Sequence, residues 1–154
     1  MKLWPFCERF YSRKPVEALC LQLQDNHNIC VGLVIWLCWH AAYGRFLNEA
    51  TFAIAKREFL GADHGMIEQL RSVRKILKSS ALADGAAIKS HILAAEILLE
   101  KAILERLESY IQLQELTPDS AAFGLLDYLR QHQVPEADRS AQFLYANALA
   151  CITQ

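Results

Sequence analysis

Residues 29–39 read ICVGLVIWLCW, a run of eleven residues without a polar side chain. A helix that crosses a membrane needs about 20 such residues, and His40 and Arg45 follow this run too closely for that length. We therefore expect residues 29–43 to form a helix at the centre of a folded domain, buried on all sides, and we expect no membrane span. Gly32 interrupts this helix, and its missing side chain predicts that a second helix approaches closely there.

The composition extends the helical prediction to the rest of the chain. The 154 residues include 21 Ala and 23 Leu but only 5 Val and 3 Thr, which favours helices over strands. A chain of this length has room for one domain, so we expect residues 1–154 to fold as a single unit. All four prolines precede apolar stretches of helical periodicity, where proline fits the first turn of a helix.

These signals predict an all-α fold, a single compact bundle of about eight helices packed around the 29–43 helix and a long 85–115 helix. Thr117 and Pro118 are expected to begin the seventh helix, and Gly124 to interrupt it. The predicted helices cover residues 4–12, 15–25, 29–43, 48–60, 64–78, 85–115, 118–132 and 136–151.

Charge and motifs exclude several function classes. With 16 basic and 17 acidic residues the formal charge is −1, which argues against nucleic acid or an acidic membrane as the partner of the whole surface. The sequence has no phosphate-binding loop, no G-x-S-x-G motif and no dinucleotide fingerprint. We therefore predict no cofactor, and the sequence leaves open whether the protein is an enzyme.

The five cysteines give no pattern of disulfides or metal ligands. Their number is odd, they form no C-x-x-C pair, and their spacing fits no zinc site. The first residues lack the continuous apolar segment of a signal peptide. We expect reduced thiols, no metal site and a cytoplasmic location.

Two carboxylates on the long helix are candidates for chemistry. Glu96 and Glu100 lie one turn apart on the same side as Leu93, Ile103 and Leu107. They repel each other, and an apolar setting raises the pKa of the one that ionises last. Such a pair is typical of an acid/base or metal site in a helical bundle. The alternatives are neutralisation by a basic side chain of a neighbouring helix and exposure of this edge to water.

The tryptophan helix offers a second candidate. Trp36, Trp39, His40 and Tyr43 share one face, so His40 is a ligand, a proton carrier or a hydrogen-bonded core residue. Asp25 belongs to the polar link 25–28. It points into the same pocket or satisfies the backbone of the turn.

The only concentrated basic patch lies on the 64–78 helix. Arg71, Arg74, Lys75 and Lys78 can contact an acidic protein surface or a nucleic-acid backbone, or form a solvated helix face. No aromatic residue interleaves them, so a platform for single-stranded nucleic acid is not indicated.

The first third of the chain resembles a family of bacterial proteins of unknown function, found mainly in gammaproteobacteria. The resemblance rests on LW-x-F at 3–6, FY at 10–11, CL-x-LQD at 20–25 and W-x-A-x-x-G at 39–44. The family favours Gly, Asp and Asn where this chain has Asn28, Cys30 and Gly32, so a polar site at those positions would be incomplete here. The resemblance implies a bacterial cytoplasmic protein and no particular activity.

Three hypotheses follow. The first is a small helical accessory protein that binds a protein partner, with the basic helix as one candidate surface. The second is a ligand- or metal-binding helical protein, or an enzyme, with a pocket between the 29–43 and 85–115 helices formed around His40, Glu96 and Glu100. The third is a homodimer through either of these helices, with Gly32 allowing close approach.

Overall fold

The computed structural model describes residues 1–45, 47–111 and 122–153. Within these residues the chain forms eight helices and a two-stranded antiparallel sheet, in which Leu47 pairs with Phe123 and Asn48 with Ala122. The helices are α1 (Leu3–Tyr11), α2 (Lys14–His27), α3 (Val31–Ala42), α4 (Glu49–Phe59), α5 (Ala62–Lys78), α6 (Gly85–Ile111), α7 (Leu125–Gln131) and α8 (Ala137–Ile152). The strands are β1 (Leu47–Asn48) and β2 (Ala122–Phe123). The all-α prediction is confirmed, and no helix in the described ranges has the length and apolar character needed to cross a membrane.

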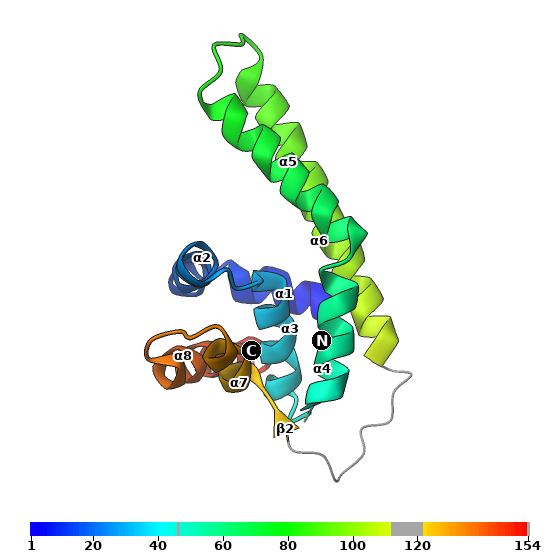
Figure 1. Cartoon of the computed structure of the whole chain (residues 1–154), viewed down its shortest axis with the longest axis vertical. Coiled ribbons are helices and arrows are strands. Elements are labelled where there is room, and N and C mark those ends of the chain that lie inside the picture. Colours follow the sequence, from blue (N-terminus) through cyan, green and yellow to red (C-terminus); the bar gives the residue numbers. More distant parts are fainter. Residues whose placement is uncertain (46, 112–121, 154) are drawn as a thin grey trace.

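Helix α3 is the centre of the fold, as its apolar run predicts. Every side chain from Leu33 to His40 is buried, and α1, α2, α4, α7 and α8 pack around the helix (Figure 1). Gly32 makes the predicted close approach, because a Cβ there would lie 2.1 Å from Cζ of Phe59. That partner is α4 of the same chain. The contact at Gly32 is therefore occupied within the chain, which corrects the idea that Gly32 serves a contact between two copies.

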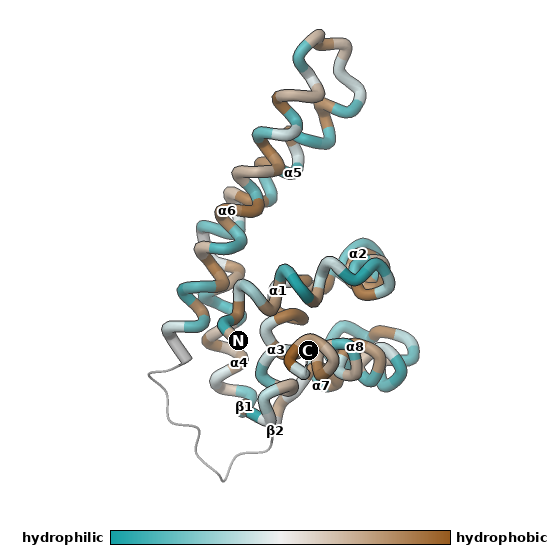
Figure 2. The backbone as a smooth tube through the Cα atoms, turned by 180° about the vertical axis from the view of Figure 1, so that it is seen from behind, coloured by the Kyte–Doolittle hydropathy of each residue, from teal (hydrophilic) through white to brown (hydrophobic). Residues whose placement is uncertain are grey.

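Helices α5 and α6 form an antiparallel pair that projects from this body, and we call residues 62–102 the arm (Figures 1 and 2). The long helix was expected at the centre of the bundle. Instead it enters the core only near its C-terminal end, through Ile103, Leu104 and Leu107. In the described part of the chain its N-terminal half lies beside α5, away from the body (Figure 1).

Some predicted boundaries shift. Helix α2 continues to His27 and ends at Asn28, whose left-handed backbone (φ 53°) forms the turn. The polar link that includes Asp25 is thus shorter than predicted. Gly124 begins α7 as its N-cap, and its N–H donates to Asp127 Oδ2 at 2.9 Å. The prediction that Gly124 interrupts a helix is therefore wrong. The predicted helix start at Thr117 and Pro118 lies outside the described residues.

Candidate functional site

Among the described residues, the buried imidazole of His40 finds no hydrogen-bond partner. Its side chain is 1% exposed, and neither ring nitrogen has a partner among the described residues. The rings of Trp36 and Trp39 pack edge-on against it, with centroid distances of 4.7 and 4.8 Å. Burial, together with the charge of Arg45, lowers the pKa of His40 to about 3. The imidazole is therefore neutral at pH 7 and offers one donor and one acceptor.

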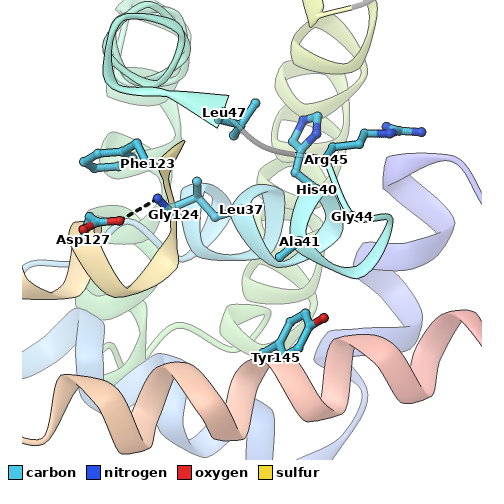
Figure 3. Close-up of a pocket in the computed structure, with 10 residues that line it drawn as sticks. All are labelled: Leu37, His40, Ala41, Gly44, Arg45, Leu47, Phe123, Gly124, Asp127 and Tyr145. Carbon is cyan, nitrogen blue, oxygen red and sulfur yellow. Dashed lines mark hydrogen bonds between the residues drawn. The ribbon is translucent and has the colours of Figure 1, made fainter. Parts of the chain in front are cut away.

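A cavity of about 340 Å³ lies beside His40, at the C-terminal end of α3 (Figure 3). Figure 3 shows residues of α3 on one side, Tyr145 of α8 on another and Phe123 with Asp127 on a third. The cavity has the size of a small-molecule site. Its lining residues are Leu37, His40, Ala41, Gly44, Arg45, Leu47, Phe123, Gly124, Asp127 and Tyr145.

The charged groups of this cavity are held by local contacts. The guanidinium of Arg45 stacks over the rings of Trp39 (4.6 Å) and Tyr43 (5.1 Å), which holds the cation at the rim. Trp39 is fixed in turn, because its Nε1–H donates to the carbonyl of Met1 at 3.1 Å. Asp127 is committed to capping α7 through Gly124 N–H. The site thus has the neutral imidazole of His40 and the cation of Arg45 on one side and the carboxylate of Asp127 on the opposite side (Figure 3).

The carboxylate pair of the long helix lies elsewhere. Arg74 binds Glu96 through Nε and Nη2 at 2.7 and 3.0 Å, and Glu96 is 3% exposed. Arg71 binds Glu100 through Nη2 and Glu68 through Nη1. Burial raises the pKa of Glu100, although Arg71 lowers it. Neutralisation by a neighbouring helix, one of the alternatives from the sequence, is the arrangement observed. The predicted acidic pair and half of the predicted basic patch form one ion-pair network between α5 and α6.

The two carboxylates predicted to share a pocket with His40 are paired with arginines of α5. Neither Glu96 nor Glu100 lines the cavity beside His40, because both carboxylates face α5. Asp25 is exposed in the last turn of α2 and lines neither this cavity nor a second one of about 230 Å³. Trp36 and Trp39 share a helix face with His40 and pack edge-on against its ring.

Of the residues that line the cavity, sequence reasoning predicted only His40 as a site residue, and it missed the three other polar side chains. Arg45, Asp127 and Tyr145 come from three separate segments. Gly124 followed three residues later by Asp127 is a helix-capping signal that locates the start of α7. No signal in the sequence joins that start to His40.

The arm presents a second candidate surface. Among residues 68–102, all of which the structure describes, Glu96 is the only buried residue. Large apolar residues occur along the arm, and Figure 2 shows backbone coloured as hydrophobic over its full length. The exposed ones are Met66 (44%), Val73 (45%), Ile76 (69%), Leu82 (60%), Ile88 (38%), Leu93 (42%), Ile97 (44%) and Leu98 (66%). Lys75 and Lys78 of the predicted basic patch are also exposed here.

Comparison with known proteins assigns the chain to a family. Searches of curated proteins and of solved structures found no match. A family model covers residues 2–107, which include α1 to α5, most of α6 and therefore the whole arm, whereas α7 and α8 lie beyond it. This match spans more than half of the sequence. The chain therefore belongs to the family described as "Protein of unknown function (DUF2390)".

Proposed function

We propose that this chain is a helical interaction protein that binds a protein partner through its arm. The observation that supports this most is the arm's lack of buried apolar side chains between residues 68 and 102, combined with its exposed ones. Monomeric soluble proteins rarely leave a contiguous apolar surface of this kind uncovered unless it binds something. Five thiols without disulfide partners fit a cytoplasmic location, which is part of the proposal.

The energetics of the arm favour a partner. Two helices that pack only on each other bury little apolar surface, and helices gain most of their stability from packing. The contact between them contains the ion pair of Arg74 with Glu96, and such pairs add little net stability when buried. A partner that covers the apolar side chains would supply the missing stabilisation.

The test compares two charge-introducing variants. Ile76→Glu combined with Leu98→Glu alters the two most exposed apolar side chains of the arm. Leu21→Glu makes the same change on α2 of the body, where Leu21 is 41% exposed. A partner captured by the wild-type chain should be purified and its Kd measured against all three proteins. The arm variant should raise this Kd at least tenfold while Leu21→Glu leaves it unchanged. Equal Kd values for all three would refute the proposal.

A second function is favoured by His40, and it is binding of a small polar molecule in the cavity. Buried polar groups are almost always hydrogen-bonded, so an imidazole with two unpaired nitrogens beside a cavity needs an explanation such as a ligand or a water molecule. A ligand that offers both a donor and an acceptor would satisfy the neutral ring. Native mass spectrometry of gently purified protein tests this function. A bound mass in the wild type that is absent from His40→Leu supports it, and a bare chain mass in both refutes it.

A further inference from the structure

We infer that the arm's partner is a second copy of this chain, and that two arms pair antiparallel into a four-helix bundle. This inference rests on the proposed function of the arm and names the occupant of its surface. It is supported by four observations: the spacing of the apolar residues, the side of the arm on which they lie, the area they expose and the distribution of charge.

The apolar residues follow the spacing of helices that pack side by side. On α5, Met66, Leu70, Val73 and Leu77 are separated by four, three and four residues. On α6, Ile88, Ile92, Ala95, Leu99 and Ala102 continue the same alternation of four and three. This heptad spacing is the pattern that lets an apolar seam face a partner helix. We call these nine residues the outer seam.

The outer seam lies along one edge of the contact between α5 and α6: Leu70, Leu77, Ile92 and Leu99 are half-buried there, whereas Met66, Val73 and Ile88 are exposed. Around the axis of α5, the centre of the seam is rotated by about 100° from Arg71 and Arg74. Around the axis of α6, it is rotated by about 100° in the same sense from Glu96 and Glu100. Because the two helices are antiparallel, both halves of the seam lie on the same face of the arm.

In the described structure the body packs on α6 near its C-terminal end, where Ile103, Leu104 and Leu107 are buried in the core. It also reaches α6 through Glu108, which accepts from the Leu3 N–H at 2.8 Å, and through Lys101, which lies 5.9 Å from the Trp4 ring centroid. Both residues point roughly 150° away from the outer seam on α6. A second arm can therefore approach the seam without displacing the body.

The exposed area fits a dimer. The outer seam, with Ile76 and Leu98 at its edge, exposes apolar surface on the order of 600 Å², close to the roughly 800 Å² that each partner contributes to a specific interface. No lysine, arginine, aspartate or glutamate belongs to the seam. Its best complement is an uncharged apolar helix pair, which a second copy provides.

The charges of the arm favour the antiparallel arrangement. Near the tip of the arm Lys75, Lys78 and Lys89 outnumber Asp84, whereas Asp63 and Glu68 near its base each form an ion pair within the chain, with Arg106 and Arg71. Antiparallel pairing keeps the basic tips of the two arms apart. Parallel pairing would bring the basic tips together, including Lys89 of α6, and like charges repel.

The first experiment measures molecular mass by light scattering over a range of concentrations. The wild type should be a dimer. Val73→Glu, in the outer seam, should raise the dimer Kd at least tenfold. Leu93→Glu is the matched control, because Leu93 is similarly exposed (42% against 45%) but lies on the opposite flank of the arm. A wild type that stays monomeric up to about 100 µM, roughly a hundred times a micromolar Kd, overturns the inference.

The second experiment distinguishes the two directions of pairing. Val73→Cys lies near the middle of the seam, so a short bismaleimide should link two copies in the antiparallel dimer. Leu82→Cys lies at the tip, and in that dimer the two tips are about 30 Å apart and should not be linked. Native thiols should react little, because burial raises the pKa of Cys7 to about 12 and of Cys30 to about 11. Linking through Leu82→Cys alone would overturn the antiparallel arrangement.

These results separate the inference from the function on which it rests. A monomeric wild type whose arm variant still loses a different protein partner refutes self-pairing and leaves the interaction function standing. A monomeric wild type whose partners bind independently of the arm refutes both. A dimer that Val73→Glu dissociates and Leu93→Glu does not supports both.

Discussion

Replacement of His40 by leucine should make stability less sensitive to acid. In the folded protein burial and the charge of Arg45 lower the pKa of His40 to about 3, from 6.5 for an ordinary imidazole. Between pH 6.5 and pH 3, His40 is therefore protonated in the unfolded chain but neutral in the folded chain. The free energy of unfolding therefore decreases as the pH is lowered from 6.5, until the pH reaches the pKa of the folded state.

The size of this effect follows from the two pKa values. Each unit of pH within the window costs at most about 1.4 kcal/mol for one group. Between pH 7 and pH 4.5 His40 should remove about 2–3 kcal/mol of stability. The stability that depends on a neutral His40 is fully present above pH 6.5, declines as the pH is lowered, and is lost completely near pH 3. His40→Leu removes the titrating group and should abolish this part of the acid sensitivity.

At pH 7 the substitution should change stability by less than about 2 kcal/mol. Leucine removes two unpaired buried nitrogens, which stabilises the fold. It also removes the edge-on contacts with Trp36 and Trp39, which destabilises it. The two terms oppose each other, so the informative quantity is the difference between pH values.

Urea unfolding of both proteins at pH 7, 6, 5 and 4.5 measures that difference. Subtracting the variant from the wild type cancels the carboxylates that titrate in the same range. His91→Gln removes an exposed imidazole from α6 and should follow the wild type. A wild-type minus variant difference that stays constant within about 0.5 kcal/mol across these pH values would refute the reasoning.

Three further perturbations test the packing. Gly32→Ala should destabilise the protein by about 1–3 kcal/mol in urea unfolding, because its Cβ would meet the Phe59 ring, and Phe59→Leu in the same chain should recover part of the loss. Glu96→Leu should cost about 2–3 kcal/mol by leaving Arg74 unpaired, and adding Arg74→Leu should restore most of it; additive losses in the double-mutant cycle would contradict this. Labelling of the five thiols with a maleimide at pH 8 should be at least tenfold slower in the folded than in the urea-unfolded protein, because burial raises their pKa, to about 12 for Cys7. Equal rates would show that the thiols are accessible.

The centre of the fold is predictable because one segment allows only one environment. The run at 29–39 is too apolar for a surface and too short for a membrane, so it must be a buried helix, and α3 spans Val31–Ala42. Gly32 likewise predicts a close helix contact from the sequence alone, since glycine in a helix leaves space for a neighbouring side chain. Phe59 supplies that residue, but the sequence does not identify it.

The candidate sites are less predictable because they depend on which helices meet. Periodicity places Glu96 and Glu100 on one face of α6 and Arg71 and Arg74 on one face of α5, but it gives no information about the relative position of the two helices. The turn at residues 79–84 makes them antiparallel neighbours and converts two predicted sites into one ion-pair network. The partners of His40 in its cavity are separated from it by up to 105 residues of sequence, counted from His40 to Tyr145. No local pattern connects them.

The arm also shows that periodicity does not identify which surface covers an apolar stripe. Val16, Cys20 and Leu23 on α2 have helical spacing and are buried within the chain. Met66 and Val73 on α5 have equally regular spacing and stay 44–45% exposed. Both stripes predict a partner surface, because an amphipathic helix gains its stability by covering its apolar face. For α2 the rest of the chain supplies that surface. For α5 the described residues cover Leu70 and Leu77 in part and leave Met66 and Val73 exposed. The proposed pairing with a second arm would cover these exposed side chains, which is the same physical requirement that folds the body.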